Sequence, residues 1–189
     1  TAHGGNAWVY FDGTTKDLWG QIVELMGTRG IAVFPYYEYS GSKGSKGLGF
    51  QRRCKPLTRE DGNYTHIKWV ESANADLTDP ETYDDFRKML DLTVVRFRGK
   101  AEFVGAWIRS RGQMPVSFAD ATLARFNHET SQAEPVTRKI LEANDALYQT
   151  YLAWWREKRR DFFVAMRDYL HANGIEGGTL LYTPCASES

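Results

Sequence analysis

Three times in this sequence a helical pattern ends at a glycine-containing turn and leads into a short apolar stretch. The three steps join residues 18–29 to 31–37, residues 83–98 to 101–108, and residues 140–172 to 179–183. Gly30, Gly99 and Gly174 stand at the turns, and we expect each to take the left-handed conformation that closes a last helical turn. The apolar stretches are short and continuous, which is typical of strands covered on both faces. The pattern predicts an α/β fold with a parallel sheet, whose functional groups lie where the strands end.

The boundaries of the expected elements follow from turn and capping signals. Four strands are expected, over residues 8–11, 31–34, 102–108 and 179–183, as parallel neighbours in that order with the helices outside. Asp79 and Pro80 predict a helix start. Ser117 and Asp120 have the spacing of a capping box before a short helix over residues 117–127. The first helix, over residues 18–29, is expected to bury Leu18, Ile22, Leu25 and Met26.

The stretch from residue 40 to residue 79 has little periodicity. Structureless loops of this length are uncommon in compact domains. This one carries large apolar residues, among them Phe50 and Trp69, so we interpret it as an ordered insertion over the strand ends. Its glycine-, serine- and lysine-rich beginning does not match the spacing of a phosphate-binding loop. No domain linker is evident, and residues 1–189 are expected to form a single domain.

Charge and composition narrow the classes of partner and cofactor. Twenty-four basic and 24 acidic residues give a net charge of zero, which removes the electrostatic reason to expect nucleic acid. No apolar run is long enough to span a bilayer, so no membrane is expected as partner. The four histidines lack metal-ligand spacing, and Cys54 and Cys185 are expected to be free thiols. We therefore expect neither a metal nor another cofactor.

Several segments resemble the barrel glycoside hydrolases of the β-galactosidase-like retaining group. DFRKMLDLTVVRFRGK (85–100) and FVGAWI (103–108) resemble the third helix and fourth strand of that barrel. SFADATLARF (117–126) is similar to the segment after that strand, and YLAWWREKRRDF (151–162) to the fourth helix. RGIAVFPYY (29–37) is similar to the preceding helix-to-strand step. The resemblance implies a partial (β/α) TIM-type barrel, with strands two to five and the long inserted loop over residues 40–79.

The resemblance also implies where catalytic groups belong, and here the sequence departs from the family. In that group the fourth strand ends in an Asn-Glu pair whose glutamate is the general acid. The corresponding place reads Trp107-Ile108-Arg109-Ser110, without a carboxylate. The family's nucleophile stands on a later strand. The catalytic pair of the family therefore has no counterpart among these residues.

Glu38 is the candidate for acid–base chemistry, because it stands among tyrosines where the second strand ends. A carboxylate among aromatic side chains can hydrogen-bond sugar hydroxyls, and burial would raise its pKa toward acid–base use. Tyr37 and Arg53 are candidates to contact the same ligand. The alternative is a structural ion pair of Glu38 with Arg52 or Arg53 that holds the loop.

Trp107 and Arg109 are the other two candidates for ligand contact. Residues two apart on a strand share a face, so the indole and the guanidinium are expected to point the same way. Together they would suit a heavily hydroxylated or acidic sugar. The alternative is a core tryptophan beside an arginine in a structural ion pair.

Three functions remain open on these observations. The first is a retaining glycoside hydrolase, or a fragment of one, which needs two carboxylates at a glycosidic bond. The second is a non-catalytic carbohydrate-binding relative on the same barrel, and the third is an open α/β domain without a sugar function. A closed barrel needs about eight strands, so we expect the chain to be completed by the remainder of a longer chain or to self-associate.

Overall fold

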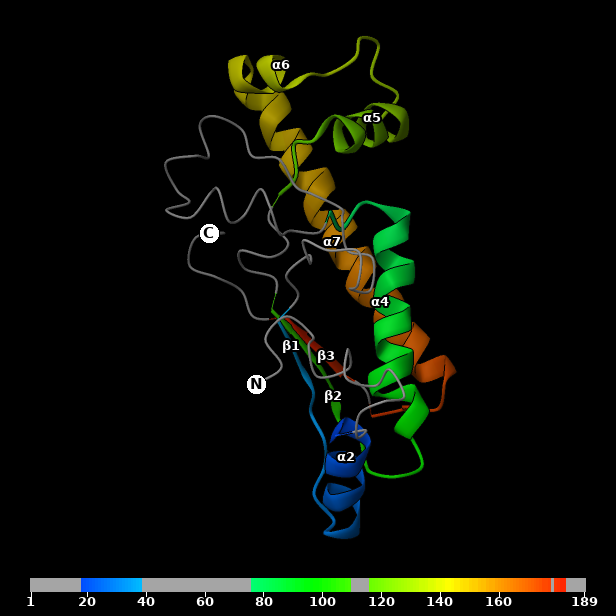
Figure 1. Ribbon diagram of the computed structural model, residues 1–189. Helices are drawn as coiled ribbons and strands as arrows, with labels where there is room; N and C mark the ends of the chain where they lie inside the picture. The colour runs from blue at the N-terminus through cyan, green and yellow to red at the C-terminus, as the bar shows by residue number, and fades with distance from the viewer. Residues whose placement is uncertain (1–17, 39–75, 110–115, 178, 183–189) are drawn as a thin grey trace.

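The computed structural model describes residues 18–38, 76–109, 116–177 and 179–182. The elements, in chain order, are α2 (Leu18–Thr28), β1 (Tyr36–Glu38), α4 (Pro80–Thr93), the 3₁₀ turn η3 (Val95–Phe97), β2 (Gly105–Arg109), α5 (Asp120–Glu129), α6 (Arg138–Ala143), α7 (Asp145–Ala172) and β3 (Thr179–Tyr182). Figure 1 shows α4 running alongside the long helix α7, with α5 and α6 near the beginning of α7 and α2 at the other end of the molecule.

The three described strands form one parallel sheet in the order β1-β2-β3. Tyr36 pairs with Trp107, and Trp107 pairs with Leu181, so the three strands end at the same edge. The prediction of parallel neighbours in chain order is confirmed for these three strands. The expected strand over residues 8–11 lies outside the described residues.

The first described strand begins later than the sequence predicts. We expected it over residues 31–34, but β1 starts at Tyr36, and the earlier stretch makes only a bridge between Val33 and Phe103. Pro35 separates the two, because a proline has no amide hydrogen to give to the ladder. Its carbonyl still accepts a bond of 2.9 Å from the amide of Trp107.

A bulge in the second strand lies between the bridge and the ladder. From Val33 to Tyr36 the chain takes three steps, whereas from the partner Phe103 to the partner Trp107 it takes four. The extra residue falls around Gly105, whose φ of 148° is one that residues with a side chain rarely adopt. The alternation of buried and exposed side chains along the strand is reset at this bulge: Phe103 and Ala106 are both buried, while Val104 and Trp107 are both exposed.

The helix ends agree with the sequence at two of the three glycines. Gly30 and Gly174 have φ of 65° and 82°, as expected for residues that close a helix. Gly99 does not take a positive φ, because α4 already ends at Thr93 and the chain continues through η3. The helix expected over residues 140–172 is also interrupted, since Asn144 accepts from the Leu147 amide at 3.0 Å and starts α7 as a new helix.

Helix starts give one confirmation and one correction. Asp79 caps α4 by accepting from the Glu81 amide at 2.9 Å, with Pro80 in the first turn as predicted. The capping box of Ser117 and Asp120 is wrong, because α5 is capped at Ala119 without a side-chain bond. Its two members make other contacts, described below.

The core lies between the helices and one face of the sheet. The stripe predicted for helix α2 is wrong in part: Met26 packs against the core as expected, but Val23 is the fully buried residue, and Ile22 and Leu25 are about half exposed. Between α4 and α7, Phe86 and Phe162 meet edge to face with ring centroids 5.2 Å apart. A second aromatic cluster joins α5 to α7 and consists of Phe118, Phe126, Tyr148, Tyr151 and Trp154.

Helices α4 and α7 lie against one face of the sheet. Tyr37 of β1 packs edge to face on Phe86 of α4, and α7 contacts β3. Each described connection between strands contains helix, as parallel strands require. Most of the insertion expected over residues 40–79 lies outside the described residues, which resume at Asp76.

Candidate functional site at the carboxyl ends of the strands

Three aromatic side chains gather on the face of the sheet opposite α4 and α7. Trp107 lies beside its register partner Tyr36, with ring centroids 5.3 Å apart and the planes nearly perpendicular at 79°. Phe34 stacks on the same indole, with ring centroids 6.4 Å apart. Tyr36 is 47% exposed and Trp107 39% exposed. We call Phe34, Tyr36 and Trp107 the aromatic face.

The bulge around Gly105 places Trp107 on this face. Had the register of Val33 and Phe103 continued unchanged, Tyr36 would pair with Ala106, and Trp107 would stand opposite the buried Tyr37. The extra residue turns the indole to the side of the sheet opposite α4 and α7, where it meets Tyr36. Bulges that redirect a side chain are common next to functional sites. A glycine inside a strand pattern was the sequence signal for this feature.

The structure separates Tyr37 from Trp107, which corrects the expectation that both line one surface. Tyr37 is 2% exposed on the helix-covered side, and its hydroxyl lies 2.5 Å from the Thr93 hydroxyl. Burial raises the pKa of Tyr37 above its ordinary value, so the phenol stays protonated. Tyr37 is therefore a core residue, and Tyr36 beside it occupies the exposed position.

The backbones of Glu38 and Arg109 meet at the carboxyl edge of the sheet. They are the last residues of β1 and β2 and are register partners. The fold thus brings two sequence-predicted candidates together next to Trp107. The fifth candidate, Arg53, lies outside the described residues, as does Arg52.

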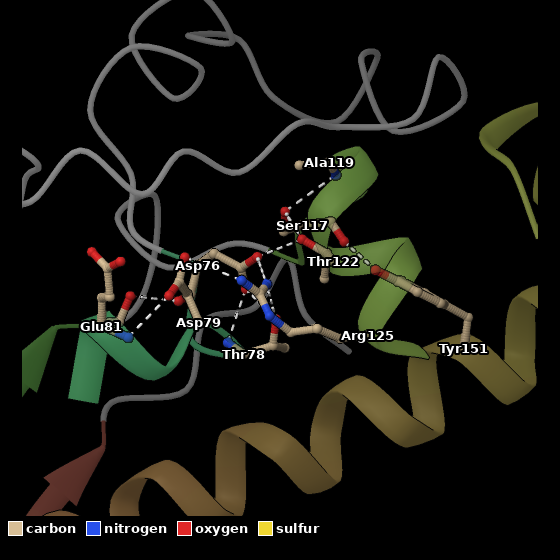
Figure 2. A network of polar contacts seen from close by, with 10 residues as sticks. Asp76, Thr78, Asp79, Glu81, Ser117, Ala119, Thr122, Arg125 and Tyr151 are labelled. Atoms are coloured by element: carbon tan, nitrogen blue, oxygen red, sulfur yellow. Dashed lines mark hydrogen bonds and ion pairs between the residues drawn. The ribbon is translucent and has the colours of Figure 1, made fainter. Parts of the chain in front are cut away.

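A buried polar network joins the start of α4 to α5 (Figure 2). Its centre is Asp76, which is 3% exposed. One carboxylate oxygen accepts from the amide of Thr78 at 2.9 Å and from its hydroxyl at 2.7 Å. The other accepts from the Thr122 hydroxyl and from the Arg125 guanidinium, at 3.2 Å in the second case. Arg125 also reaches Asp79, the cap of α4, at 3.2 Å.

The network continues into α5 and α7 through hydroxyl groups. Because the Thr122 proton goes to Asp76, the Ser117 hydroxyl donates to Thr122, at 2.8 Å. The Ser117 carbonyl accepts from the Tyr151 hydroxyl of α7. Asp120 instead pairs with Arg138 at 3.2 Å.

We interpret the network as structural, because both carboxylate oxygens of Asp76 have hydrogen-bond partners. It joins the start of α4, which follows the connection from β1, to α5, which follows the connection from β2. Buried charges are retained where they are paired and fully hydrogen-bonded. Sequence reasoning found the cap at Asp79 but missed Asp76, because its partners Thr122 and Arg125 are more than 40 residues away in the chain.

Two further observations on the described residues concern metal ions and membranes. No three histidine, cysteine or carboxylate side chains among them gather as they would around a metal ion. None of the described helices is long and apolar enough to cross a membrane.

Comparison of the chain with protein-family models, with curated proteins and with solved structures found no match.

Proposed function

We propose that this chain is part of a carbohydrate-active (β/α)-barrel protein of the glycoside hydrolase type, in which the aromatic face binds a sugar ring. The observation that carries the proposal is the in-register pair of Tyr36 and Trp107, which is partly exposed and lies two residues before Glu38 and Arg109, the last residues of the two strands. Ligands of parallel α/β folds bind at that edge.

The order of the strands supports the barrel part of the proposal. Parallel crossovers are right-handed in nearly all folds. The crossovers from β1 to β2 and from β2 to β3 both move to the next strand in the same direction across the sheet. Right-handed crossovers in one direction put their helices on the same face of the sheet. The other face is then left for a barrel interior, which agrees with the exposure of Tyr36 and Trp107. The remaining strands would come from a longer chain or from a second copy that pairs with the outer edges of β1 and β3.

The chemistry of the aromatic face supports a sugar as ligand. A pyranose ring presents apolar C–H groups on its faces and hydroxyls around its rim. Tyr36 and Trp107 combine large apolar rings with a phenol and an indole N–H, which can stack on the ring and hydrogen-bond its hydroxyls. The backbone positions of Glu38 and Arg109 at the adjacent strand ends would add a carboxylate and a guanidinium.

Hydrolysis would use Glu38 as one of two carboxylates, with the second on a strand beyond those described. Retaining enzymes place the two carboxyl groups about 5–5.5 Å apart. Non-catalytic sugar binding is the second candidate, and a specific observation favours it. The end of β2, where the resembling family has its acid, carries Trp107, Ile108 and Arg109.

The test combines turnover with binding on the full chain. Wild type and Glu38→Gln are assayed on a panel of aryl glycosides and on immobilised glycans. Turnover that is lost in Glu38→Gln supports the hydrolase, because the substitution keeps shape and removes charge. Binding without turnover supports the non-catalytic protein. Absence of both contradicts the proposal in favour of an α/β domain without a sugar function.

A further inference from the structure

Tyr37 occupies the middle of a very short strand whose neighbouring residue Tyr36 belongs to the aromatic face. Strand β1 has three residues, and its described partner strand lies on one edge only. Such a strand has few main-chain bonds to fix its rotation about its own axis. A side-chain hydrogen bond on the helix-covered side can restrict this rotation instead.

The hydroxyl of Tyr37 makes such a hydrogen bond. It lies 2.5 Å from the Thr93 hydroxyl, whose single proton is already donated to the Met89 carbonyl at 2.7 Å. Tyr37 is therefore the donor. Both residues are buried, at 2% exposure each, and Phe86 packs against the phenol ring at a centroid distance of 6.3 Å.

Thr93 is also the point where three elements meet. It is the last residue of α4, and its carbonyl accepts from the Trp19 indole of α2 at 2.8 Å. A bond from Tyr37 to this residue ties β1 to α4 directly and to α2 through Thr93. Rotation of β1 would break that bond and would also move Tyr36 relative to Trp107, because neighbouring strand residues point to opposite faces.

We propose that Tyr37 is a positioning residue for the aromatic face: its hydroxyl, bonded to Thr93, fixes the orientation in which Tyr36 lies edge-on to Trp107. It touches no ligand in this role. The part that concerns sugar affinity rests on the proposed function, whereas the part that concerns ring geometry does not.

The experiment uses the full chain labelled with 5-fluorotryptophan and observed by fluorine NMR. The resonance of Trp107 is assigned by its loss in Trp107→Phe. Tyr37→Phe removes only the hydroxyl and is expected to shift or broaden the Trp107 resonance. Where a glycan is bound, we expect the variant to bind it up to about tenfold more weakly, the equivalent of one hydrogen bond.

Tyr151→Phe is the matched control. It removes another buried tyrosine hydroxyl, bonded to the Ser117 carbonyl, and lies on α7 rather than on the sheet. It is expected to lower the melting temperature similarly and to leave the Trp107 resonance in place. A Tyr37→Phe spectrum in which Trp107 is unchanged would overturn the proposal, as would an equal response in the control.

A second pair of variants approaches the same bond from the other side. Thr93→Val removes the accepting hydroxyl and is expected to reproduce the Trp107 shift. Thr93→Ser keeps the hydroxyl and is expected to retain the wild-type position. Identical spectra for these two variants would contradict the proposal even if Tyr37→Phe fails to fold. If wild type binds no glycan but the resonances behave as expected, the proposed function fails while the positioning role stands.

Discussion

The two faces of the sheet differ in what their aromatic residues do, although the residues alternate along the same strands. Tyr37 is 2% exposed beneath α4, whereas Tyr36 next to it is 47% exposed. On β2, Ala106 is fully buried and Trp107 is 39% exposed. On the covered face, the Tyr37 hydroxyl bonds to Thr93 of α4 and the Tyr37 ring packs on Phe86 of the same helix. On the other face, Trp107 contacts Phe34 and Tyr36. The position of a tyrosine in this strand thus decides whether its ring is buried in the core or partly exposed.

The largest contrast is expected from truncating one ring on each face. Phe86→Ala leaves a cavity between β1, α4 and α7 and should lower the free energy of unfolding by about 3–5 kcal/mol. Tyr36→Ala removes a half-exposed ring and its edge contact with Trp107, and should cost about 1 kcal/mol. Denaturant titrations of both variants measure the difference. Equal losses would mean that the aromatic face is buried as deeply as the core.

Removing the centre of the buried network should have the next largest effect. Asp76→Ala takes the acceptor from Thr78, Thr122 and Arg125, and should cost about 3 kcal/mol, because buried donors lose their acceptor and the partly buried Arg125 keeps only Asp79 as a carboxylate partner. The described contacts of the network lie around α4, α5 and α7 rather than on the sheet, so we expect any sugar binding per folded molecule to persist.

Asp84→Ala is the control for the network, since that carboxylate makes an exposed ion pair with Arg87. Its effect on the free energy of unfolding should stay within about 0.5 kcal/mol. A loss as small as this in Asp76→Ala would show that the network does not stabilise the fold.

The bulge gives a smaller and more specific prediction. Gly105→Ala forces a side chain onto a φ of 148° and should cost about 1–3 kcal/mol. Because the bulge turns Trp107 toward Tyr36, sugar affinity should fall as well. Gly99→Ala is the matched control: its φ is not positive, and an added Cβ meets nothing within 4 Å. Thermal melts and binding curves that do not separate the two variants would contradict the role given to the bulge.

The sequence predicted the features that depend on neighbouring residues. The helix-to-strand steps, the cap at Asp79 and the parallel order of the described strands follow from local capping and periodicity. Strand phase was harder to predict, because Pro35 delays β1 and the extra residue near Gly105 shifts β2. Trp107 was identified as a candidate, but its partner Tyr36 was passed over in favour of the buried Tyr37.

Features made by distant contacts were beyond such reasoning. The capping-box spacing of Ser117 and Asp120 suggested a local pair, yet Ser117 joins the Asp76 network and Asp120 pairs with Arg138. Only the folded chain brings Asp76 to Thr122 and Arg125. The barrel and the role of Glu38 remain predictions.

Trp107→Ala, measured for glycan binding and for stability, tests directly whether the aromatic face serves a ligand while the opposite face serves stability. We expect glycan binding to be lost while the melting temperature falls by no more than about 4 °C, the effect of roughly 1 kcal/mol in a chain of this size. Trp155→Ala, which removes an indole that is 1% exposed, should lower the melting temperature far more. A Trp107→Ala variant that melts like Trp155→Ala would show that Trp107 belongs to the core, and one that binds glycan as wild type does would show that the aromatic face is not the binding surface.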